Sequence, residues 1–317
     1  MTQRFAHGTG LAWTTHDGLA LEAWFPAPAL GSPDDAAATV PTQNQVTLAR
    51  LESLESADTE RQLIRRRVDL VIDLDAAPVD APDVYLRLHL LSHRLLQPNQ
   101  VNLDGLFTVT PNVVWTHAGP CQVEGFEVVR ASLEQVGRGP VRVFGIDRLP
   151  SMTDYVVPSG VRIADARRVR LGAYLAPGTT VMHAGFVNYN AGTLGPSMVE
   201  GRISQGVVVG AGSDVGGGAS IMGTLSGGGK ERIRIGERSL LGANSGVGIS
   251  IGDDCVVEAG LYVTAGTKVK LSDGQVVKAA VLSGRPGLLF RRNSLSGAVE
   301  AVPRAAGVSL NPALHSN

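Results

Sequence analysis

Two histidines four residues apart, His89 and His93, have the spacing with which one face of a helix can hold a metal ion. The zinc-protease pattern would place a glutamate directly after His89, but Leu90 stands there, and no third ligand is evident. The chain's two cysteines, Cys121 and Cys255, are too few for a disulfide framework and read as packed thiols. We therefore interpret both histidines as structural.

Charge and composition exclude several classes of function. The 317 residues include 28 basic and 29 acidic ones, and a net charge of -1 gives no reason to expect a nucleic-acid partner. Residues 1–10 lack a secretory signal, and no stretch approaches the roughly 18 apolar residues of a membrane span. We expect a cytoplasmic protein with no membrane partner that acts on small molecules.

The elements that must position any reactive residue are set by a six-residue period between Ile163 and Val269. Aliphatic residues recur every sixth position in four runs, and small residues often follow them directly. The runs are Ile163, Val169, Leu175, Val181 and Val187; Ile203, Val209, Val215 and Ile221; Ile235, Leu241 and Val247; and Ile251, Val257, Val263 and Val269.

A period of six fits neither an α-helix nor an open sheet, but it fits short strands separated by sharp corners. Such a hexapeptide repeat predicts a left-handed parallel β-helix, in which stacked coils bury one aliphatic column. We expect three parts: an N-terminal α/β domain in residues 1–150, the β-helix in residues 151–272, and a short C-terminal extension in residues 273–317.

The first half carries ordinary α/β signals. The predicted elements are a hairpin around His16–Gly18, a flexible connection over Pro26–Gln45, a strand over Leu63–Leu74, an amphipathic helix over Asp83–Leu96, and a helix and strand over Val123–Ile146. No nucleotide-phosphate loop is visible among them. The role of this domain stays open.

The repeat is interrupted twice, at Asn188–Arg202 and Gly223–Arg234, and interruptions in a solenoid commonly carry function. The second contains Ser226–Gly229, which is too rich in glycine to pack. A surface loop and a lid over a ligand are equally good interpretations of it.

Enzymes with this architecture are usually trimers with active sites between subunits, although a fold does not prove an activity. A zinc carbonic anhydrase needs several imidazoles, and the repeat region contains only His183. A nucleotide-sugar enzyme would need a glycine loop that the first half lacks. An acetyltransferase with His183 as general base and a catalytically silent trimeric scaffold both remain alternatives.

Five segments closely resemble the tetrahydrodipicolinate N-succinyltransferase family, actinobacterial type. They are Gly192–Arg202, Asp214–Gly229, Leu86–Arg94, Asn112–Thr116 and Leu289–Ser294. The resemblance covers nearly the whole chain apart from residues 26–62. It implies transfer of a succinyl group from the co-substrate succinyl-CoA to tetrahydrodipicolinate, in the diaminopimelate route to lysine, by a cytoplasmic homotrimer with sites between subunits.

The resemblance also implies roles for particular residues. The catalytic acid falls on Glu200, as a nucleophile that forms a mixed anhydride or as the base for the acceptor nitrogen, and Gly223 is its main-chain partner near the thioester. The implied succinyl-CoA contacts are Arg202, Gly217, Ser220, Ala243, Glu258, Ala259, Gly266, Lys278, Arg291, Arg292, Asn293 and Ser294.

Ligands that carry carboxylates and phosphates call for arginine, lysine and free backbone N–H groups. Arg202 could grip a carboxylate and keep Glu200 ionised. The small residues also suit the corners of any solenoid, and the basic tail residues could simply be solvated. Tyr189 and Asn190 are candidates for the acceptor pocket. Donor preference between succinyl and acetyl stays open.

One departure from the family concerns a metal. Close relatives carry acidic residues where this chain has Arg167 and Ala184, and those carboxylates can gather a divalent cation on the trimer axis. Three arginines near one axis would repel a cation. We therefore expect no magnesium site of that kind and no metal in the chemistry.

Overall fold

The computed structural model describes residues 3–33, 48–137, 140–224, 226 and 230–304. The chain divides into two compact units, Met1–Leu96 with Gln100–Val156, and Gln97–Asn99 with Val157–Asn317. Most of the expected connection Pro26–Gln45, and residues 227–229 of the expected glycine loop, lie outside the described residues.

The main sheet of the first unit is antiparallel, with the strand order β2-β1-β5-β4, and β3 pairs with β1. Its strands are β1 (Phe5–Thr15), β2 (Ala20–Trp24), β3 (Ala29–Leu30), β4 (Ser56–Asp58) and β5 (Leu63–Asp73). The predicted hairpin joins β1 and β2. Its turn contains Gly18 at φ 93°, a left-handed conformation that glycine adopts without a Cβ clash.

Helix α2 (Ala81–Ser92) forms where the sequence predicts a helix, and Asp80 caps it by accepting a hydrogen bond from the Asp83 N–H. The prediction that this helix is amphipathic is wrong, because all twelve of its residues are buried. Its polar members are satisfied internally. Arg87 pairs with Asp83 at 2.7 Å and donates to backbone carbonyls of neighbouring segments.

His89 on α2 has a structural environment. Its Nε2 accepts a hydrogen bond from the Phe25 N–H at 3.3 Å, and its Nδ1 donates to the Tyr85 carbonyl at 2.7 Å. Burial lowers the pKa of His89 to about 3, so the ring stays neutral at physiological pH. Both ring nitrogens are already engaged, which supports the structural interpretation of this residue.

The rest of the first unit consists of short elements. They are α1 (Leu48–Glu52), α3 (Leu106–Val109), β6 (Val113–Thr116), β7 (Gly119–Gln122), α4 (Phe126–Gln135), β8 (Val143–Asp147) and the 3₁₀ turn η2 (Met152–Asp154). Strands β7, β6 and β8 form a small antiparallel sheet. A core that includes Val114, Phe126 and Leu133 joins α4 to this sheet.

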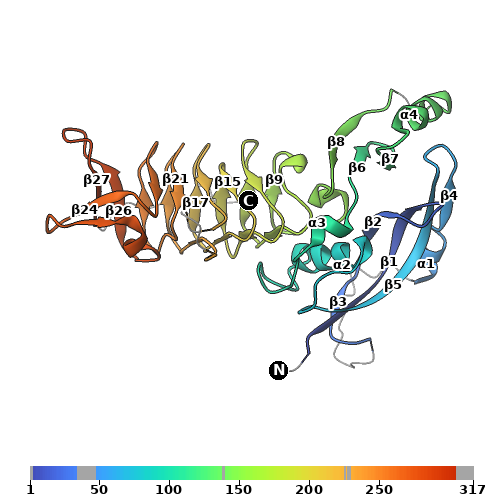
Figure 1. Cartoon of the computed structure of the whole chain (residues 1–317), viewed down its shortest axis with the longest axis horizontal. Helices are drawn as coiled ribbons and strands as arrows, with labels where there is room; N and C mark the ends of the chain where they lie inside the picture. The colour runs from blue at the N-terminus through green and yellow to red at the C-terminus, as the bar shows by residue number, and fades with distance from the viewer. Residues whose placement is uncertain (1–2, 34–47, 138–139, 225, 227–229, 305–317) are drawn as a thin grey trace. The chain divides into compact units, whose positions relative to one another are not determined.

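The second unit is a parallel β-helix whose strands stack into three faces (Figure 1). The first face contains β10 (Tyr174–Leu175), β13 (Gly192–Thr193), β16 (Val208–Val209) and β19 (Arg234–Ile235). The second contains β9 (Arg162–Ile163), β11 (Thr179–Val181), β14 (Ser197–Val199), β17 (Ser213–Val215), β20 (Leu240–Leu241), β22 (Val256–Val257) and β26 (Leu288–Arg292). The third contains β12 (Phe186–Val187), β15 (Arg202–Ile203), β18 (Ser220–Ile221), β21 (Gly246–Gly248) and β23 (Tyr262–Thr264).

Beyond the coils, β26 pairs with β27 (Val299–Pro303), which also pairs with β24 (Lys268–Leu271). Strand β25 (Val276–Lys278) pairs with β24, and two further 3₁₀ turns, η3 (Ala166–Arg168) and η4 (Ala279–Leu282), belong to this unit. None of the helices in the described part of the chain has the length and hydrophobicity of a membrane span.

The period of six is confirmed as the core of the β-helix. Fifteen of the sixteen periodic residues are no more than 2% exposed, and Ile163, in the first coil, is half-buried. Each strand therefore contributes one inward side chain, and parallel pairing places these side chains one above another.

The prediction that the repeat is interrupted at Asn188–Arg202 is wrong, because β13 and β14 continue the coils in register. The apolar pattern fails there because Thr193 occupies an inward position, where its hydroxyl bonds to that of Thr179 at 2.7 Å. A buried hydroxyl pair can replace an aliphatic contact when both groups are satisfied. The second interruption is a true insertion between β18 and β19.

The paired residues Leu240 and Leu241 test the core. We expect Leu241→Ala, at an inward and fully buried position, to lower the free energy of unfolding by about 2–5 kcal/mol through the lost burial and the cavity. Leu240→Ala is the matched control, because this side chain points outward and is only half-buried. Chemical denaturation of both variants gives the comparison, and equal losses would contradict an inward column.

Candidate functional site

The corners between the second and third faces form one edge of the β-helix, which we call the small-residue edge. It consists of Glu200–Gly201, Gly216–Gly217, Gly242–Ala243 and Glu258–Ala259 in successive coils. Backbone hydrogen bonds stack these corners, from Gly216 N to Leu241 O at 2.8 Å, and from Gly242 N to Val257 O at 2.8 Å. Four predicted contacts and the predicted catalytic acid therefore lie along one line.

Some glycines at this edge are required by the fold. A Cβ on Gly216 would lie 2.6 Å from the Leu241 carbonyl, and one on Gly242 would lie 2.5 Å from the Ala259 nitrogen. Gly217 differs, because a Cβ there would meet only the Glu200 Oε2, at 3.4 Å. Coil packing therefore does not require glycine at position 217. The absence of a side chain at this position leaves the Glu200 carboxylate uncovered.

Glu200 is held by its backbone, since its N–H donates to the Val215 carbonyl at 2.8 Å and its carbonyl accepts from the Gly218 N–H. Its side chain is half-buried, and its carboxylate makes no hydrogen bond or ion pair within the described residues. The Arg202 guanidinium donates to the Ser220 hydroxyl at 2.6 Å and forms no ion pair with Glu200, and its predicted grip on a ligand carboxylate stays a prediction. The backbone of Glu200 is thus fixed, while its carboxylate has no partner among the described residues and is available to a ligand.

Arg202 and Ser220 are cross-strand neighbours on the outside of the third face. The next residue in this row is Gly246, and the Tyr262 ring lies so close that a Cβ on Gly246 would be 2.1 Å from it. This face therefore presents an exposed guanidinium next to the small-residue edge. An exposed guanidinium suits a ligand carboxylate or phosphate.

Three other predicted residues gather at the opposite edge, between the third and first faces. Gly223 begins the insertion there, where Ile233 N donates to its carbonyl at 3.3 Å. Ser226 ties the insertion across two later coils, since its N–H donates to Gly248 O and its hydroxyl accepts from Ala265 N at 2.7 Å.

Gly266 and Lys278 lie at this opposite edge too. The Ala279 N–H donates to the Thr267 carbonyl at 2.8 Å, which holds the end of β25 against the turn that contains Gly266. The predicted site residues are thus divided between two edges of the third face. Within one chain the structure does not bring Glu200 and Gly223 together.

The last coil supplies the remaining predicted contacts. The Glu258 carboxylate accepts from the Arg292 N–H at 2.6 Å. Arg291 pairs with Glu300 at 3.0 Å, and Asn293 donates to the same carboxylate, which together lower the pKa of Glu300. The Arg292 guanidinium donates only to the Gly297 carbonyl among the described residues and is exposed, and Ser294 is exposed beside it. Arg292 is therefore the freer cation of the two arginines.

His183, the alternative general base, is exposed on the small-residue side one coil before Glu200, because the adjacent Met182 N donates to Val199 O. Arg167 pairs with Asp165 at 3.3 Å, and Arg168 donates to the Ala184 carbonyl. The described residues contain no cluster of three or more metal-ligating side chains. The expectation of no magnesium site stays a prediction.

Sequence reasoning missed one polar group in the first unit. Glu22 on β2 is 3% exposed and lies between the buried residues Leu21 and Ala23. Alternation along a strand predicts that Leu21 and Ala23 share one face and that Glu22 points to the opposite face. Nothing in the local sequence indicated that this opposite face is also covered by other segments.

Comparisons with known proteins agree with this architecture. A family model described as the hexapeptide repeat of succinyl-transferase matches residues 232–265, and one described as tetrahydrodipicolinate N-succinyltransferase middle matches residues 111–151. A solved structure from Campylobacter jejuni, described as a 2,3,4,5-tetrahydropyridine-2-carboxylate N-succinyltransferase, superposes with a TM-score of 0.78 at 30% identity over 94% of this chain and 92% of that one. These similarities support left-handed coils.

Two curated proteins are close in sequence, and both are named 2,3,4,5-tetrahydropyridine-2,6-dicarboxylate N-succinyltransferase. The one from Pseudomonas paraeruginosa is 59% identical over 249 residues, which cover 77% of this chain and 72% of that protein. The one from Pseudomonas aeruginosa is 53% identical over 304 residues, which cover 92% of this chain and 88% of that protein.

The neighbouring glycines Gly216 and Gly217 provide a test of the edge. We expect Gly216→Ala to destabilise the fold by about 1–3 kcal/mol, because its Cβ would overlap backbone. Gly217→Ala should change stability by no more than about 0.5 kcal/mol. Thermal unfolding of the two variants distinguishes them, and a large loss in Gly217→Ala would mean that this glycine is architectural as well.

Proposed function

This chain belongs to the 2,3,4,5-tetrahydropyridine-2,6-dicarboxylate N-succinyltransferase family, and from that premise we propose that it is an acyltransferase of lysine biosynthesis. It transfers the succinyl group of succinyl-CoA to tetrahydrodipicolinate. With one water taken up on ring opening, the products are N-succinyl-2-amino-6-oxoheptanedioate and free CoA. The observation that carries the choice of site is the uncovered, unpaired Glu200 carboxylate beside Gly217.

Glu200 would act on the acceptor nitrogen or on the thioester. As a base, it takes the proton from the nitrogen while the nitrogen attacks the thioester carbonyl and the CoA thiolate leaves. As a nucleophile, its oxygen attacks that carbonyl, releases the thiolate and forms a mixed anhydride, which the nitrogen then cleaves. Rapid quenching of enzyme with succinyl-CoA alone separates the two, because only the nucleophile leaves a succinylated enzyme.

The small-residue edge is the proposed track for the CoA arm. Gly217, Ala243 and Ala259 leave room along three successive coils, and the exposed Arg292 at the end of the track suits a phosphate. At the other end, Arg202 would receive the terminal carboxylate of the succinyl group, exchanging its bond to Ser220 for a stronger ionic one. This arrangement would favour succinyl over acetyl as the donor.

The separation of Glu200 and Gly223 supports a site between subunits. In one chain, Glu200 and Gly223 lie at opposite edges of the third face. A main-chain group of Gly223 could therefore reach a thioester beside Glu200 only if it came from another copy of the chain. We propose a homotrimer, in which the edge of each β-helix meets the opposite edge of its neighbour. The backbone N–H groups of the neighbour would stabilise the thioester oxyanion.

The catalytic proposal is tested by Glu200→Gln. Because the amide can neither accept the proton nor attack, we expect kcat to fall about 10²–10⁴-fold in thiol release from succinyl-CoA with tetrahydrodipicolinate. Glu237→Gln is the matched control, since Glu237 follows a strand at a different corner of the coil. Near-normal turnover in Glu200→Gln, with a folded protein, would remove Glu200 from the mechanism.

The intersubunit site is tested by mixing two variants that we expect to be inactive, Glu200→Gln because it lacks the acid, and Gly223→Val because its side chain would block the approach of the main chain to the thioester. Glu200→Gln and Gly223→Val chains, dissociated together and reassembled, should regain about a quarter of the wild-type activity, because some sites then combine an intact Glu200 with an intact Gly223. Each variant reassembled alone is the control. Activity that stays at the level of the separate variants would contradict a site shared between copies.

A further inference from the structure

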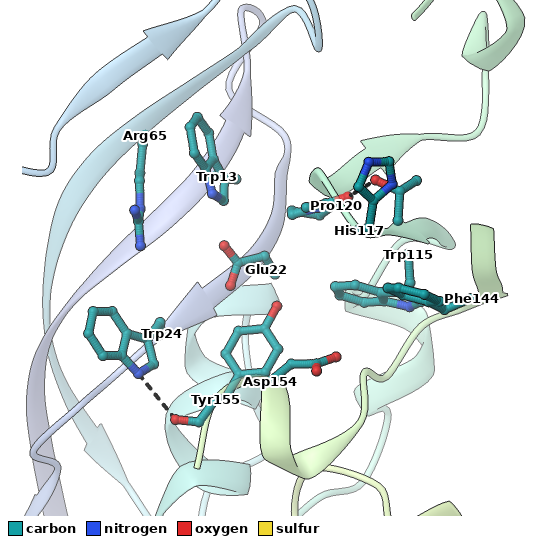
Figure 2. A pocket seen from close by; sticks show the side chains of 12 residues that line it. Trp13, Glu22, Trp24, Arg65, Trp115, His117, Pro120, Phe144, Asp154 and Tyr155 are labelled. Carbon is teal, nitrogen blue, oxygen red and sulfur yellow. Dashed lines mark hydrogen bonds between the residues drawn. The ribbon is translucent and has the colours of Figure 1, made fainter. Parts of the chain in front are cut away.

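A pocket of about 450 Å³ lies within the first unit. All three tryptophans of the chain, Trp13, Trp24 and Trp115, line it, together with Phe144 and Tyr155. The indole N–H groups of Trp24 and Trp115 donate to the backbone carbonyls of Tyr155 and Asp147, so their rings are fixed as apolar walls. Figure 2 shows the bond from Trp24 to Tyr155. A volume of this size suits a small organic ligand.

A buried carboxyl group faces this pocket. Glu22 is 3% exposed, and the Tyr155 hydroxyl points toward its carboxyl group (Figure 2). Its Oε2 finds no hydrogen-bond partner within the described part of the chain. Burial raises the pKa of Glu22 to about 7. An unsatisfied buried acid is costly to the fold, which is a reason to look for a ligand that satisfies it.

A cation stands in the same row of the sheet. Glu22 on β2 pairs in register with Trp13 on β1, and Trp13 pairs with Arg65 on β5. The backbones of Glu22 and Arg65 are therefore two strand spacings apart, which is about 10 Å. No ion pair joins them among the described residues, and the buried Arg65 Nε also lacks a hydrogen-bond partner there.

Arg61 does not complete this pair. Its guanidinium is bound to Asp58 at 3.0 Å and to the Pro120 carbonyl, and it packs 4.0 Å from the Trp13 ring centroid. It therefore fixes the indole that stands between Glu22 and Arg65. His117, also at the pocket, accepts from the Arg142 N–H through Nδ1, so that nitrogen carries no proton.

A second carboxylate lies at the pocket, since Asp154 lines it and is exposed. Figure 2 shows Glu22 in the middle of the group, with the Tyr155 hydroxyl toward it and Asp154 on the side of Trp115. The pocket thus offers two carboxylates, one guanidinium and several aromatic faces. Its charge complement is a ligand with two cationic groups and one anionic group.

We propose that this pocket binds a basic α-amino acid, with its α-ammonium on the Glu22 Oε2, its α-carboxylate on the Arg65 Nε, and its side-chain ammonium toward Asp154 between the aromatic walls. The two unsatisfied atoms of the pocket would then both gain partners from one zwitterion. This binding site is separate from the proposed acyl-transfer site and does not depend on it.

Isothermal titration calorimetry of the full chain tests the proposal with L-lysine as the probe, at about pH 8 so that Glu22 is ionised. We expect one site per chain. L-norleucine, which lacks only the side-chain ammonium, should bind at least about 10-fold more weakly. Absence of heat with lysine at about 10 mM, or equal affinity for norleucine, would overturn the proposal.

Variants assign the site. Glu22→Gln and Arg65→Met should each weaken lysine binding by about 10-fold or more. Glu124→Gln, at an exposed position outside the pocket, is the matched control and should bind normally. Unfolding temperatures check that each variant is folded, and lysine affinity unchanged in a folded Glu22→Gln variant would contradict the assignment.

Discussion

The close approach of backbone at the corners of successive coils is the constraint on which the second unit depends. A side chain at Gly216 or Gly242 would overlap the next coil, so these corners must be bare. The inward aliphatic column stabilises the stack only while that approach is kept. The same constraint that builds the core therefore leaves an edge with little side-chain cover, which an extended ligand can follow.

A few residues at or beside the small-residue edge differ from what coil packing alone would require, and the proposed chemistry depends on them. Glu200 keeps a carboxylate where the next two coils have Gly216 and Gly242, and Gly217 stays glycine although packing would admit a Cβ. Arg202 stands on the adjoining face. A regular scaffold makes such departures visible, because every position has a structural expectation to compare with.

The β-helix could be predicted from sequence because each side of a coil places one inward aliphatic residue, which repeats every six positions. Where the interior is polar, as at Thr193, the apolar period fails and the sequence suggests an interruption that the structure does not contain. Helix α2 was wrongly predicted to be amphipathic because its polar residues suggest a solvent-exposed face. In the structure, Arg87 and His89 on that helix are buried and satisfied by buried partners. Tertiary partners are not encoded in local spacing.

The candidate site was predictable only in part. Family resemblance selected Glu200 as the catalytic acid, which stays a prediction, and nothing in the local sequence indicated that Arg202 would bond to Ser220 across the face. No local signal could show that Glu200 and Gly223 end on opposite edges, because that depends on how many residues each corner uses. Glu22 was missed because a strand residue becomes buried only when other segments cover its face.

The most direct test of the central claim is a structure of the assembled protein with CoA bound. The account predicts that the pantetheine arm follows Gly217, Ala243 and Ala259, with the thiol sulfur within about 4 Å of the Glu200 carboxylate and near Gly223 of a second copy. A CoA molecule bound along any other edge, with its thiol remote from Glu200, would contradict the account.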